Sequence, residues 1–379
     1  GSIVYPEWFG GIPGVSTTAG KNACTAAFVL CYASGSKVIQ LQMGTYHCAS
    51  GLHHNVNDTV IKGMGRYSTF IKDYAADAVI EVGNVGVTRI NRFGIEDLAL
   101  LGKDAATDGV WLKSAGYGHV ARTFIEDVVS FGIELQDCIN IDLIQNNIYG
   151  PGVGAVLGQN GIVFQKVTAN NTTVRLMNNY ITGWYDGIYA DAYAITGLNS
   201  VSDIIEICTY GILLGTNNRA LNFLGTSFEG IVTKAIRTGS GNITVINPEG
   251  INYSNISFAD LPGGDISRSD AVIHIASYPA GGEAYAPATN GSYHKVGHIA
   301  SNGRGIVTLD AQSTAKTYVN TEQIVKTATP TLVNFDAQVY NVHPEFNITQ
   351  IAGTATATSA NKLVAAASTF VGAAWAVST

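Results

Sequence analysis

A glycine followed by a branched apolar residue recurs at a nearly constant interval through the middle of this 379-residue chain. The phrase begins at Gly109, Gly132, Gly161, Gly187 and Gly211, at intervals of 23, 29, 26 and 24 residues. A repeat of this length is too short to bury its own apolar face, so successive copies must stack to form one continuous core. The period therefore predicts a solenoid.

A second phrase, in step with the first, indicates that each repeat holds at least two short strands. It includes Ile95-Glu96-Asp97-Leu98 and Ile125-Glu126-Asp127-Val128, and helical spacing is almost absent between residues 38 and 250. A leucine-rich repeat would carry an asparagine signature that is missing here, and a propeller blade needs roughly forty residues or more. We therefore expect an all-β fold, a right-handed parallel β-helix.

Two repeated pairs of polar residues indicate structural roles. The recurrence of Glu96-Asp97 as Glu126-Asp127 predicts a turn, because catalytic residues need not repeat. The pairs Asn146-Asn147 and Asn178-Asn179 predict a partial ladder of stacked amides between turns of the solenoid.

Composition excludes several classes of protein. Only 13% of the residues are charged, the formal net charge is −7 and no basic tract occurs, so we expect no nucleic-acid partner. No apolar stretch is long enough to cross a membrane. The cysteines are odd in number and irregularly spaced, which predicts buried free thiols, no metal site and no cofactor. They are Cys24, Cys31, Cys48, Cys138 and Cys208.

The pattern divides the chain into three predicted parts. Residues 1–36 form an N-terminal cap with a short helix at Lys21–Tyr32, which covers the open end of the solenoid. Residues 37–260 form the parallel β-helix. Residues 261–379, where the period disappears, form a small C-terminal antiparallel β domain for trimerisation or glycan binding. Its last segment, 351–379, has one charged residue and is expected to pack against neighbouring chains.

The first third of the chain resembles a known family. Val4-Tyr5-Pro6-Glu7-Trp8-Phe9-Gly10, then Lys37-Val38-Ile39-Gln40-Leu41 with Gly44-Thr45-Tyr46, and then Thr59-Val60-Ile61-Lys62-Gly63 follow in order. They resemble the early turns of the pectate-lyase-like β-helix of bacteriophage tailspikes and capsule depolymerases. The resemblance covers roughly residues 4–260 and is specific for architecture, since this scaffold hosts many chemistries.

The resemblance implies a homotrimer attached to the phage tail through an N-terminal region missing from this sequence. It implies a virion protein, assembled in the host cytoplasm, that binds and usually depolymerises a bacterial surface polysaccharide, either capsule or O-antigen.

Alignment on the recurring glycine predicts which side chains face outward, because residues alternate across a strand. The next residue should point inward, as at Val110, Ile133, Ile162, Ile188 and Ile212. The residue after it should point outward, as at Trp111, Glu134, Val163, Tyr189 and Leu213. This outer row mixes aromatics with carboxylates, which suits a sugar-binding surface.

Aromatic residues and carboxylates are densest between residues 184 and 193. The substrate-binding residues predicted from this patch and the outer row are Trp184, Tyr185, Asp186, Tyr189, Tyr193, Trp111 and Glu134. Asp186 has an alternative role as a turn residue that binds local backbone amides.

Glycoside hydrolysis requires two carboxyl groups, separated by about 5 Å for retention or about 6.5–9.5 Å for inversion. Glu206 and Glu229 lie 23 residues apart, about one turn, and are the first predicted catalytic pair. Asp191 is the next candidate, and Glu134 with Asp191 is a possible inverting pair two turns apart.

Two other functions remain open. A polysaccharide lyase needs a base and a cation, for which Tyr117, His119 and Arg122, in an expected connection between strands, or Lys166 with Arg175 are candidates. A non-catalytic glycan-binding adhesin needs neither set. Removal of an acyl ester is also compatible with the sequence.

Overall fold

The computed structural model describes residues 2–84, 88–102, 108–152 and 154–238 with their side chains, except those of Lys234 and Thr238. Beyond residue 238 it describes the backbone of strands only. The chain divides into two compact units, Gly1–Asn199 and Ser200–Thr379. The boundary expected near residue 260 and the segment 351–379 lie outside the described residues.

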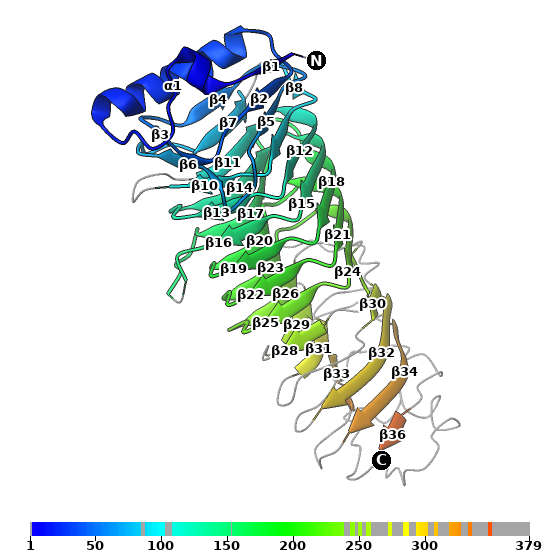
Figure 1. The fold of residues 1–379 in the computed structure, drawn as a ribbon. Helices are drawn as coiled ribbons and strands as arrows, with labels where there is room; N and C mark the ends of the chain where they lie inside the picture. The colour runs from blue at the N-terminus through cyan, green and yellow to red at the C-terminus, as the bar shows by residue number, and fades with distance from the viewer. Residues whose placement is uncertain are drawn as a thin grey trace, which may run out of the picture. The chain divides into compact units, whose positions relative to one another are not determined.

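The first unit is a parallel β-solenoid in which the chain passes in turn through three sheets, here called A, B and C (Figure 1). Sheet A contains β1 (Ile3–Val4), β2 (Val38–Gln40), β5 (Val60–Lys62), β9 (Gly94–Glu96), β12 (Ala115–Ala121), β15 (Ile139–Ile144) and β18 (Asn171–Met177), with β8 (Ile90–Asn91) beside β12. Sheet B contains β3 (Gly44–Cys48), β6 (Thr69–Asp73), β10 (Ala99–Leu101), β13 (Phe124–Glu126), β16 (Asn147–Tyr149) and β19 (Tyr180–Thr182). Sheet C contains β4 (Leu52–His54), β7 (Ile80–Gly83), β11 (Asp108–Lys113), β14 (Phe131–Gln136), β17 (Asn160–Gln165) and β20 (Asp186–Ala190). β21 (Ile195–Val201) begins in this unit. The predicted parallel β-helix is confirmed.

The recurring glycine is required by packing inside the solenoid. A Cβ on Gly132 would lie 2.2 Å from Cγ2 of Ile148 and 2.6 Å from the carbonyl oxygen of Gly161. Gly109 and Gly161 are blocked in the same way by an isoleucine of sheet B and by the next glycine of the repeat. Only glycine, which has no side chain, therefore fits at this position where the chain enters sheet C.

Four successive turns bend from sheet A into sheet B through one residue with a left-handed backbone. Asp97, Arg122, Gln145 and Asn178 directly follow β9, β12, β15 and β18, with φ of 56°, 53°, 55° and 54°. The ladder continues through this bend, because Arg122 N donates to Ile144 O at 2.8 Å and Gln145 N to Met177 O at 2.8 Å. We call this edge the A–B corner. The predicted turn at Glu96-Asp97 is confirmed there.

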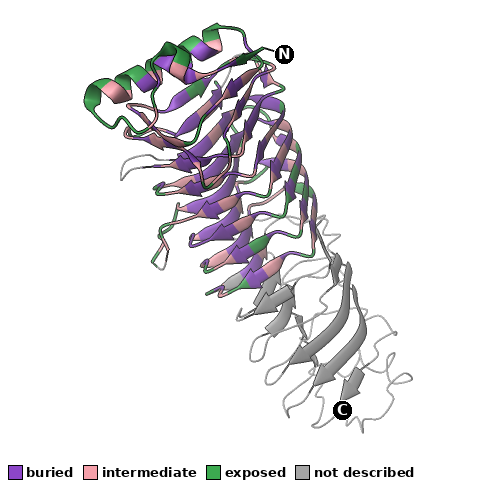
Figure 2. Cartoon of the chain, in the orientation of Figure 1, coloured by how far each residue is buried: buried purple, intermediate pink, exposed green. Residues whose placement is uncertain are grey.

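The predicted asparagine ladder is present, in the buried interior beside this corner. The side chain of Asn146 donates to Oδ1 of Asn179 at 3.0 Å, and Oδ1 of Asn146 accepts from Thr123 N at 3.1 Å. These bonds satisfy polar groups that would otherwise be costly inside an apolar core. Figure 2 shows buried residues following the strands from turn to turn.

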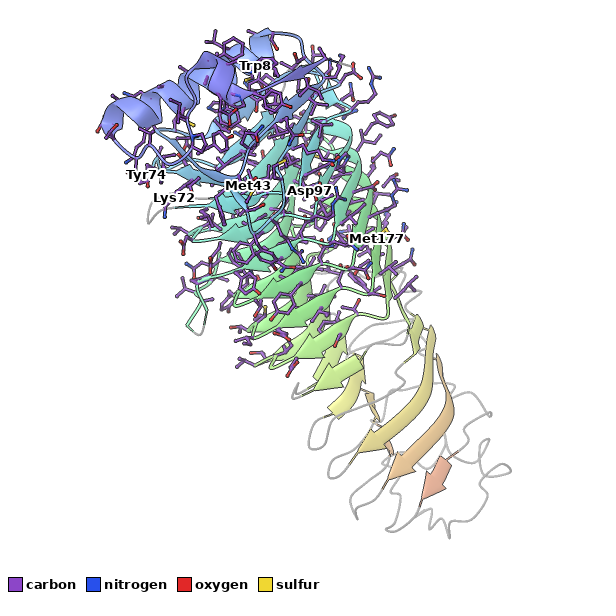
Figure 3. All side chains as sticks on the ribbon, in the orientation of Figure 1. Trp8, Met43, Lys72, Tyr74, Asp97 and Met177 are labelled. Carbon is purple, nitrogen blue, oxygen red and sulfur yellow. The ribbon has the colours of Figure 1, made fainter. Side chains whose placement is uncertain are left out.

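Helix α1 (Thr18–Ala33) covers the first turn, as the sequence predicts for the cap. It begins where Oγ1 of Thr17 accepts a hydrogen bond from Gly20 N at 3.1 Å. Its buried face includes Cys24 and Phe28, and the Phe28 ring meets Tyr46 of β3 edge-on at 6.0 Å. The preceding 3₁₀ helix η1 (Pro6–Phe9) leaves Trp8 66% exposed (Figure 3).

The second unit also contains parallel strands. They are β22 (Ile204–Glu206), β23 (Tyr210–Leu214), β24 (Arg219–Leu224), β25 (Ser227–Glu229), β26 (Lys234–Thr238), β27 (Ile243–Ile246), β28 (Glu249–Ile251), β29 (Asn255–Phe258), β30 (Val272–His274), β31 (Glu283–Pro287), β32 (Tyr293–Ser301), β33 (Val307–Leu309), β34 (Tyr318–Lys326), β35 (Val333–Phe335) and β36 (Ile348–Gln350). The expected antiparallel pairing after residue 261 is wrong for the described strands, since β31 to β36 pair in parallel. The mixed spacing of that segment did not reveal that these strands form two parallel sheets.

Candidate functional site

The outer face of sheet C carries the predicted row in register. Trp111 of β11 is paired with Glu134 of β14, then Val163 of β17 and Tyr189 of β20. The five residues predicted to point inward are fully buried, and Trp111 and Tyr189 are half-buried. The prediction of an open surface is wrong for Glu134, Val163 and Leu213, which are buried. Neighbouring side chains therefore cover part of this face.

Glu134 is recessed in this face with little access to water. Its side chain accepts a hydrogen bond from Nε2 of Gln136 at 2.6 Å, and Gln136 also donates to Oε1 of Gln165 at 3.0 Å. Burial, reinforced by the negative charge of Asp108, raises the pKa of Glu134 to about 7, and Asp191 adds to the rise. Near neutral pH this carboxyl group can therefore hold or release a proton.

Asp191 is held in place by the aromatic side chain that precedes it. The hydroxyl of Tyr189 donates to Oδ1 of Asp191 at 2.8 Å. Burial, this hydrogen bond and the nearby charges of Asp191 and Asp186 raise the pKa of Tyr189. The phenol therefore remains a donor, and Asp191 keeps a fixed orientation at the end of β20.

Trp111 offers a binding surface beside Glu134. The Nζ atom of Lys113 lies 3.2 Å from the centroid of the Trp111 ring and 2.8 Å from Oε2 of Glu81. The Nε1 atom of Trp111 is buried and has no hydrogen-bond partner among the described residues.

Trp184 does not belong to any surface, and its predicted contact with substrate is wrong. The indole is fully buried, and its Nε1 donates to the carbonyl oxygen of Ile148 at 3.2 Å. A Cβ on Gly150 or Gly161 would lie 2.6 Å and 3.1 Å from this ring. The glycines thus make room for the tryptophan inside the solenoid.

The other predicted binding residues occupy different environments. Asp186 is buried, and its negative charge contributes to the raised pKa of Tyr189 on the outer face. Tyr185 is half-buried, and Tyr193 is exposed with Nζ of Lys166 at 5.6 Å from its ring. Their contact with substrate remains a prediction.

Glu206 and Glu229 are register partners on β22 and β25 in the second unit. Their predicted adjacency is confirmed, at a strand spacing of about 4.8 Å. Glu206 is half-buried and Glu229 is exposed. Their catalytic role remains a prediction.

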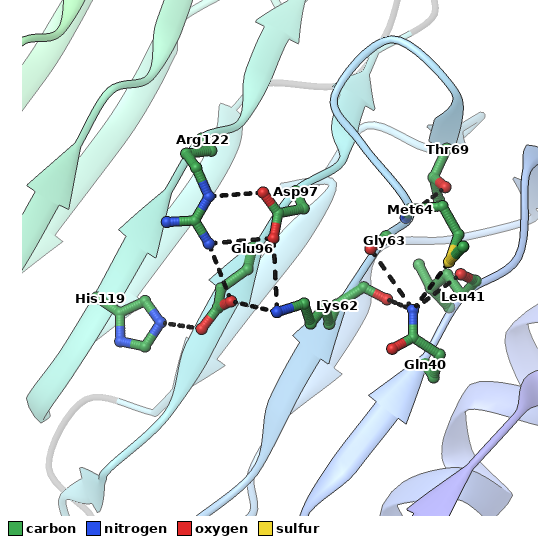
Figure 4. A network of polar contacts seen from close by, with 10 residues as sticks. All are labelled: Gln40, Leu41, Lys62, Gly63, Met64, Thr69, Glu96, Asp97, His119 and Arg122. Carbon is green, nitrogen blue, oxygen red and sulfur yellow. Dashed lines mark hydrogen bonds and ion pairs between the residues drawn. The ribbon is translucent and has the colours of Figure 1, made fainter.

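The lyase candidates His119 and Arg122 join a cluster of five charged or polar residues at the A–B corner (Figure 4). Nε2 of His119 lies 2.7 Å from Oε1 of Glu96, and Arg122 binds Asp97 through two bonds of 2.6 Å and 3.0 Å. Nζ of Lys62 lies 3.3 Å from Oε2 of Glu96.

The charges in this cluster balance one another. Burial alone would raise the pKa of Glu96, but hydrogen bonds from His119 and Lys62 outweigh it and lower that pKa. The hydrogen bond from Arg122 lowers the pKa of Asp97. With both carboxylates ionised, Lys62 and Arg122 are neutralised, so little positive charge is left for a substrate carboxylate. His119 lies on β12 rather than in the expected connection.

The second lyase set is also partly paired. Arg175 of β18 donates from Nη2 to Oδ2 of Asp142 at 2.7 Å, whereas Lys166 lies near Tyr193. All five cysteines are buried free thiols, as predicted.

Among the described residues, no group of three or more His, Cys, Asp or Glu side chains could hold a metal ion. No described helix is long and apolar enough to cross a membrane.

No family model matches this chain, and no curated protein matches it in sequence. Solved structures do match. The Dettilon tailspike protein is 14% identical, with a TM-score of 0.51 over 84% of this chain and 68% of the tailspike. PfbA, a surface adhesin of Streptococcus pneumoniae, is 10% identical, with a TM-score of 0.66 over 86% of this chain and 90% of PfbA.

An enzyme shares the fold as well. DFA-IIIase from Arthrobacter chlorophenolicus A6, solved in complex with GF2, is 12% identical, with a TM-score of 0.53 over 86% of this chain and 93% of the enzyme. The chain thus has the parallel β-helix found in phage tailspikes. At these identities the likeness shows the fold alone, so the chemistry must be argued from side chains.

Proposed function

We propose that this protein is a phage tailspike that binds and endo-cleaves a bacterial surface polysaccharide by glycoside hydrolysis. The observation that carries the proposal is the carboxyl group of Glu134, whose pKa is raised to about 7 beside Asp191. A carboxyl group that keeps its proton near neutral pH, with a second carboxyl group close by, is what acid-catalysed glycoside hydrolysis requires.

The arrangement fits inversion of configuration. Two turns separate β14 from β20, and Asp191 lies two residues beyond Tyr189, which shares the register row of Glu134. The two carboxyl groups are therefore not on adjacent turns, but they are close enough for the charge of Asp191 to raise the pKa of Glu134. A wide separation is what an inverting pair requires, because a water molecule must fit between them. Glu134 would protonate the glycosidic oxygen, and Asp191, oriented by Tyr189, would accept a proton from the attacking water.

The surrounding side chains would position the sugar. The Nζ atom of Lys113 lies over the Trp111 ring, and the exposed part of this half-buried indole would stack on a pyranose. Gln136 would hold Glu134 in place by its hydrogen bond.

The proposal includes assembly. The protein would be a homotrimeric virion component, made in the host cytoplasm and joined to the phage tail by a segment N-terminal to residue 1. Glu206 and Glu229 are the competing catalytic pair, and they occupy a different unit of the chain.

The test is mass spectrometry of products from purified host glycans, with the variants Glu134→Gln, Asp191→Asn, Glu206→Gln and Glu229→Gln. We expect oligosaccharides that carry one added water. Glu134→Gln or Asp191→Asn should slow their release by about 10²-fold or more while glycan binding persists.

The second-unit variants serve as matched controls. If Glu134→Gln kept full activity and Glu206→Gln lost it, Glu206 and Glu229 would be assigned as the catalytic pair. Products lighter by one water would indicate a lyase, and bound but intact polymer would indicate an adhesin.

A further inference from the structure

A loop between β5 and β6 reaches across several turns of the solenoid. Arg66 in this loop donates from Nη1 to the carbonyl oxygen of Gln145 at 2.9 Å and to Oδ1 of Asn147 at 3.2 Å. Nδ2 of Asn147 in turn donates to the hydroxyl of Tyr67 at 3.1 Å. The loop therefore closes over the A–B corner at β15 and β16.

The loop and the corner enclose a pocket of about 450 Å³. It is lined by Arg66, Asp97, Arg122, Gln145, Asn147 and Asn178. All six side chains are polar, and three of them carry amides. The pocket is therefore equipped to bind hydroxyl and carboxylate oxygens rather than an apolar group.

The pocket carries a net positive charge located at Arg66. Arg122 is neutralised by its two bonds to Asp97, and Lys62 by its ion pair with Glu96. Arg66 binds only neutral oxygens, and no acidic side chain forms an ion pair with it among the described residues. Its guanidinium therefore retains the capacity to pair with an incoming carboxylate.

A row of aromatic rings leads away from the pocket along sheet B. The ring of Tyr67 lies 5.8 Å from that of Phe124, Phe124 lies 5.1 Å from Tyr149, and Tyr149 lies 5.6 Å from Tyr180. Tyr67 is 65% exposed and the others are half-buried. Consecutive rings across turns offer stacking surfaces for consecutive sugars of a chain.

We propose that the A–B corner binds an acidic glycan, with the carboxylate of one sugar paired to Arg66 and neighbouring sugars stacked along Tyr67, Phe124 and Tyr149. This site is distinct from the acids on sheet C, because each turn places the A–B corner and sheet C at different sides of the solenoid. The inference rests on the proposed glycan binding but not on the catalytic assignment.

The test measures binding by the full chain carrying Glu134→Gln, so that the probe is not cleaved. Calorimetry compares tetragalacturonate with maltotetraose, a neutral chain of the same length, and an array presents glucuronate and sialate probes. We expect preference for the carboxylated probes. Arg66→Ala should weaken tetragalacturonate binding by roughly tenfold or more, with little effect on residual binding of the neutral chain.

Two matched variants separate this site from general surface effects. Arg92→Ala removes an arginine that is paired with Asp58 and should leave affinity unchanged. Tyr67→Ala should weaken binding, whereas Trp8→Ala, which removes another exposed aromatic ring, should not.

Three results would overturn the inference. They are unchanged affinity in Arg66→Ala, equal affinity for the neutral and acidic chains, or no binding of any carboxylated probe at millimolar concentration. If light scattering showed that Arg66→Ala breaks up an oligomer, the pocket would be a contact site for a neighbouring chain and not for a glycan. Cleavage that survives Glu134→Gln refutes the catalytic assignment alone.

Discussion

At the scale of single residues, the most informative group is Glu134, because its environment couples its charge to stability. The pKa rises from 4.5 to about 7 on folding. Between these values the unfolded chain has released its proton while the folded chain keeps it, so stability falls as pH rises through this window. Below pH 4.5 both states are protonated, and above about 7 the loss is complete.

We therefore expect Glu134→Gln to change the pH dependence of unfolding. The free energy of unfolding of the variant, relative to the unmodified protein, should increase by up to about 3 kcal/mol between pH 4 and pH 8. Urea unfolding at the two pH values measures this difference. Parallel curves for Glu134→Gln and the unmodified protein would contradict the raised pKa.

Sequence reasoning selected Glu134, Asp191, Trp111 and Tyr189 as candidates, because alternation along a strand determines which side of the sheet a residue faces. It could not separate an exposed row from a recessed one, since burial depends on neighbouring turns. It also placed Trp184 with the surface aromatics, because the flanking tyrosines and aspartates resemble a binding patch. The signal that was missed is the glycine density on adjacent turns, which leaves room for a large ring.

At the scale of elements, the repeat glycines test the packing explanation directly. Gly132→Ala would place its methyl group 2.2 Å from Ile148, and the backbone carbonyl of Gly161 prevents retreat. We expect a loss of about 1–3 kcal/mol of stability, as in other overpacked cores. Thermal and urea unfolding measure it.

Gly152→Ala is the control for this substitution. Gly152 has φ of 89° and nothing within 4 Å of its Cβ position, so only backbone strain opposes the methyl group. If Gly132→Ala is as stable as the unmodified protein, a steric clash inside the solenoid does not explain why glycine recurs at this position.

The elements of the solenoid could largely be predicted, since glycine period and strand composition recur in every turn. The loop that carries Arg66 could not, because its contacts join residues about eighty positions apart. The aromatic row was also missed. Phe124 and Tyr180 begin their strands, whereas Tyr149 ends its strand, so alignment at one position does not reveal it.

At the scale of the whole molecule, the sequence predicts a trimer assembled by its last segment. Residues 351–379 contain only one charge, Lys362, and a segment of this composition is expected to associate with other chains. Light scattering should give about three times the 39.8 kDa chain mass for the unmodified protein. Removal of residues 351–379 should give monomers, with the β-sheet signal in circular dichroism retained. A truncated chain that remains trimeric would place assembly elsewhere.

The enclosed indole of Trp184 gives the molecule an internal optical reporter. Its ring is surrounded by turns of the solenoid, whereas Trp8 is 66% exposed on the cap. The fluorescence of Trp184 should therefore be blue-shifted and shielded from dissolved quenchers, while that of Trp8 is accessible to them. The part of the shielded emission that is lost in Trp184→Phe reports separation of the stacked turns themselves, even when the cap is unchanged.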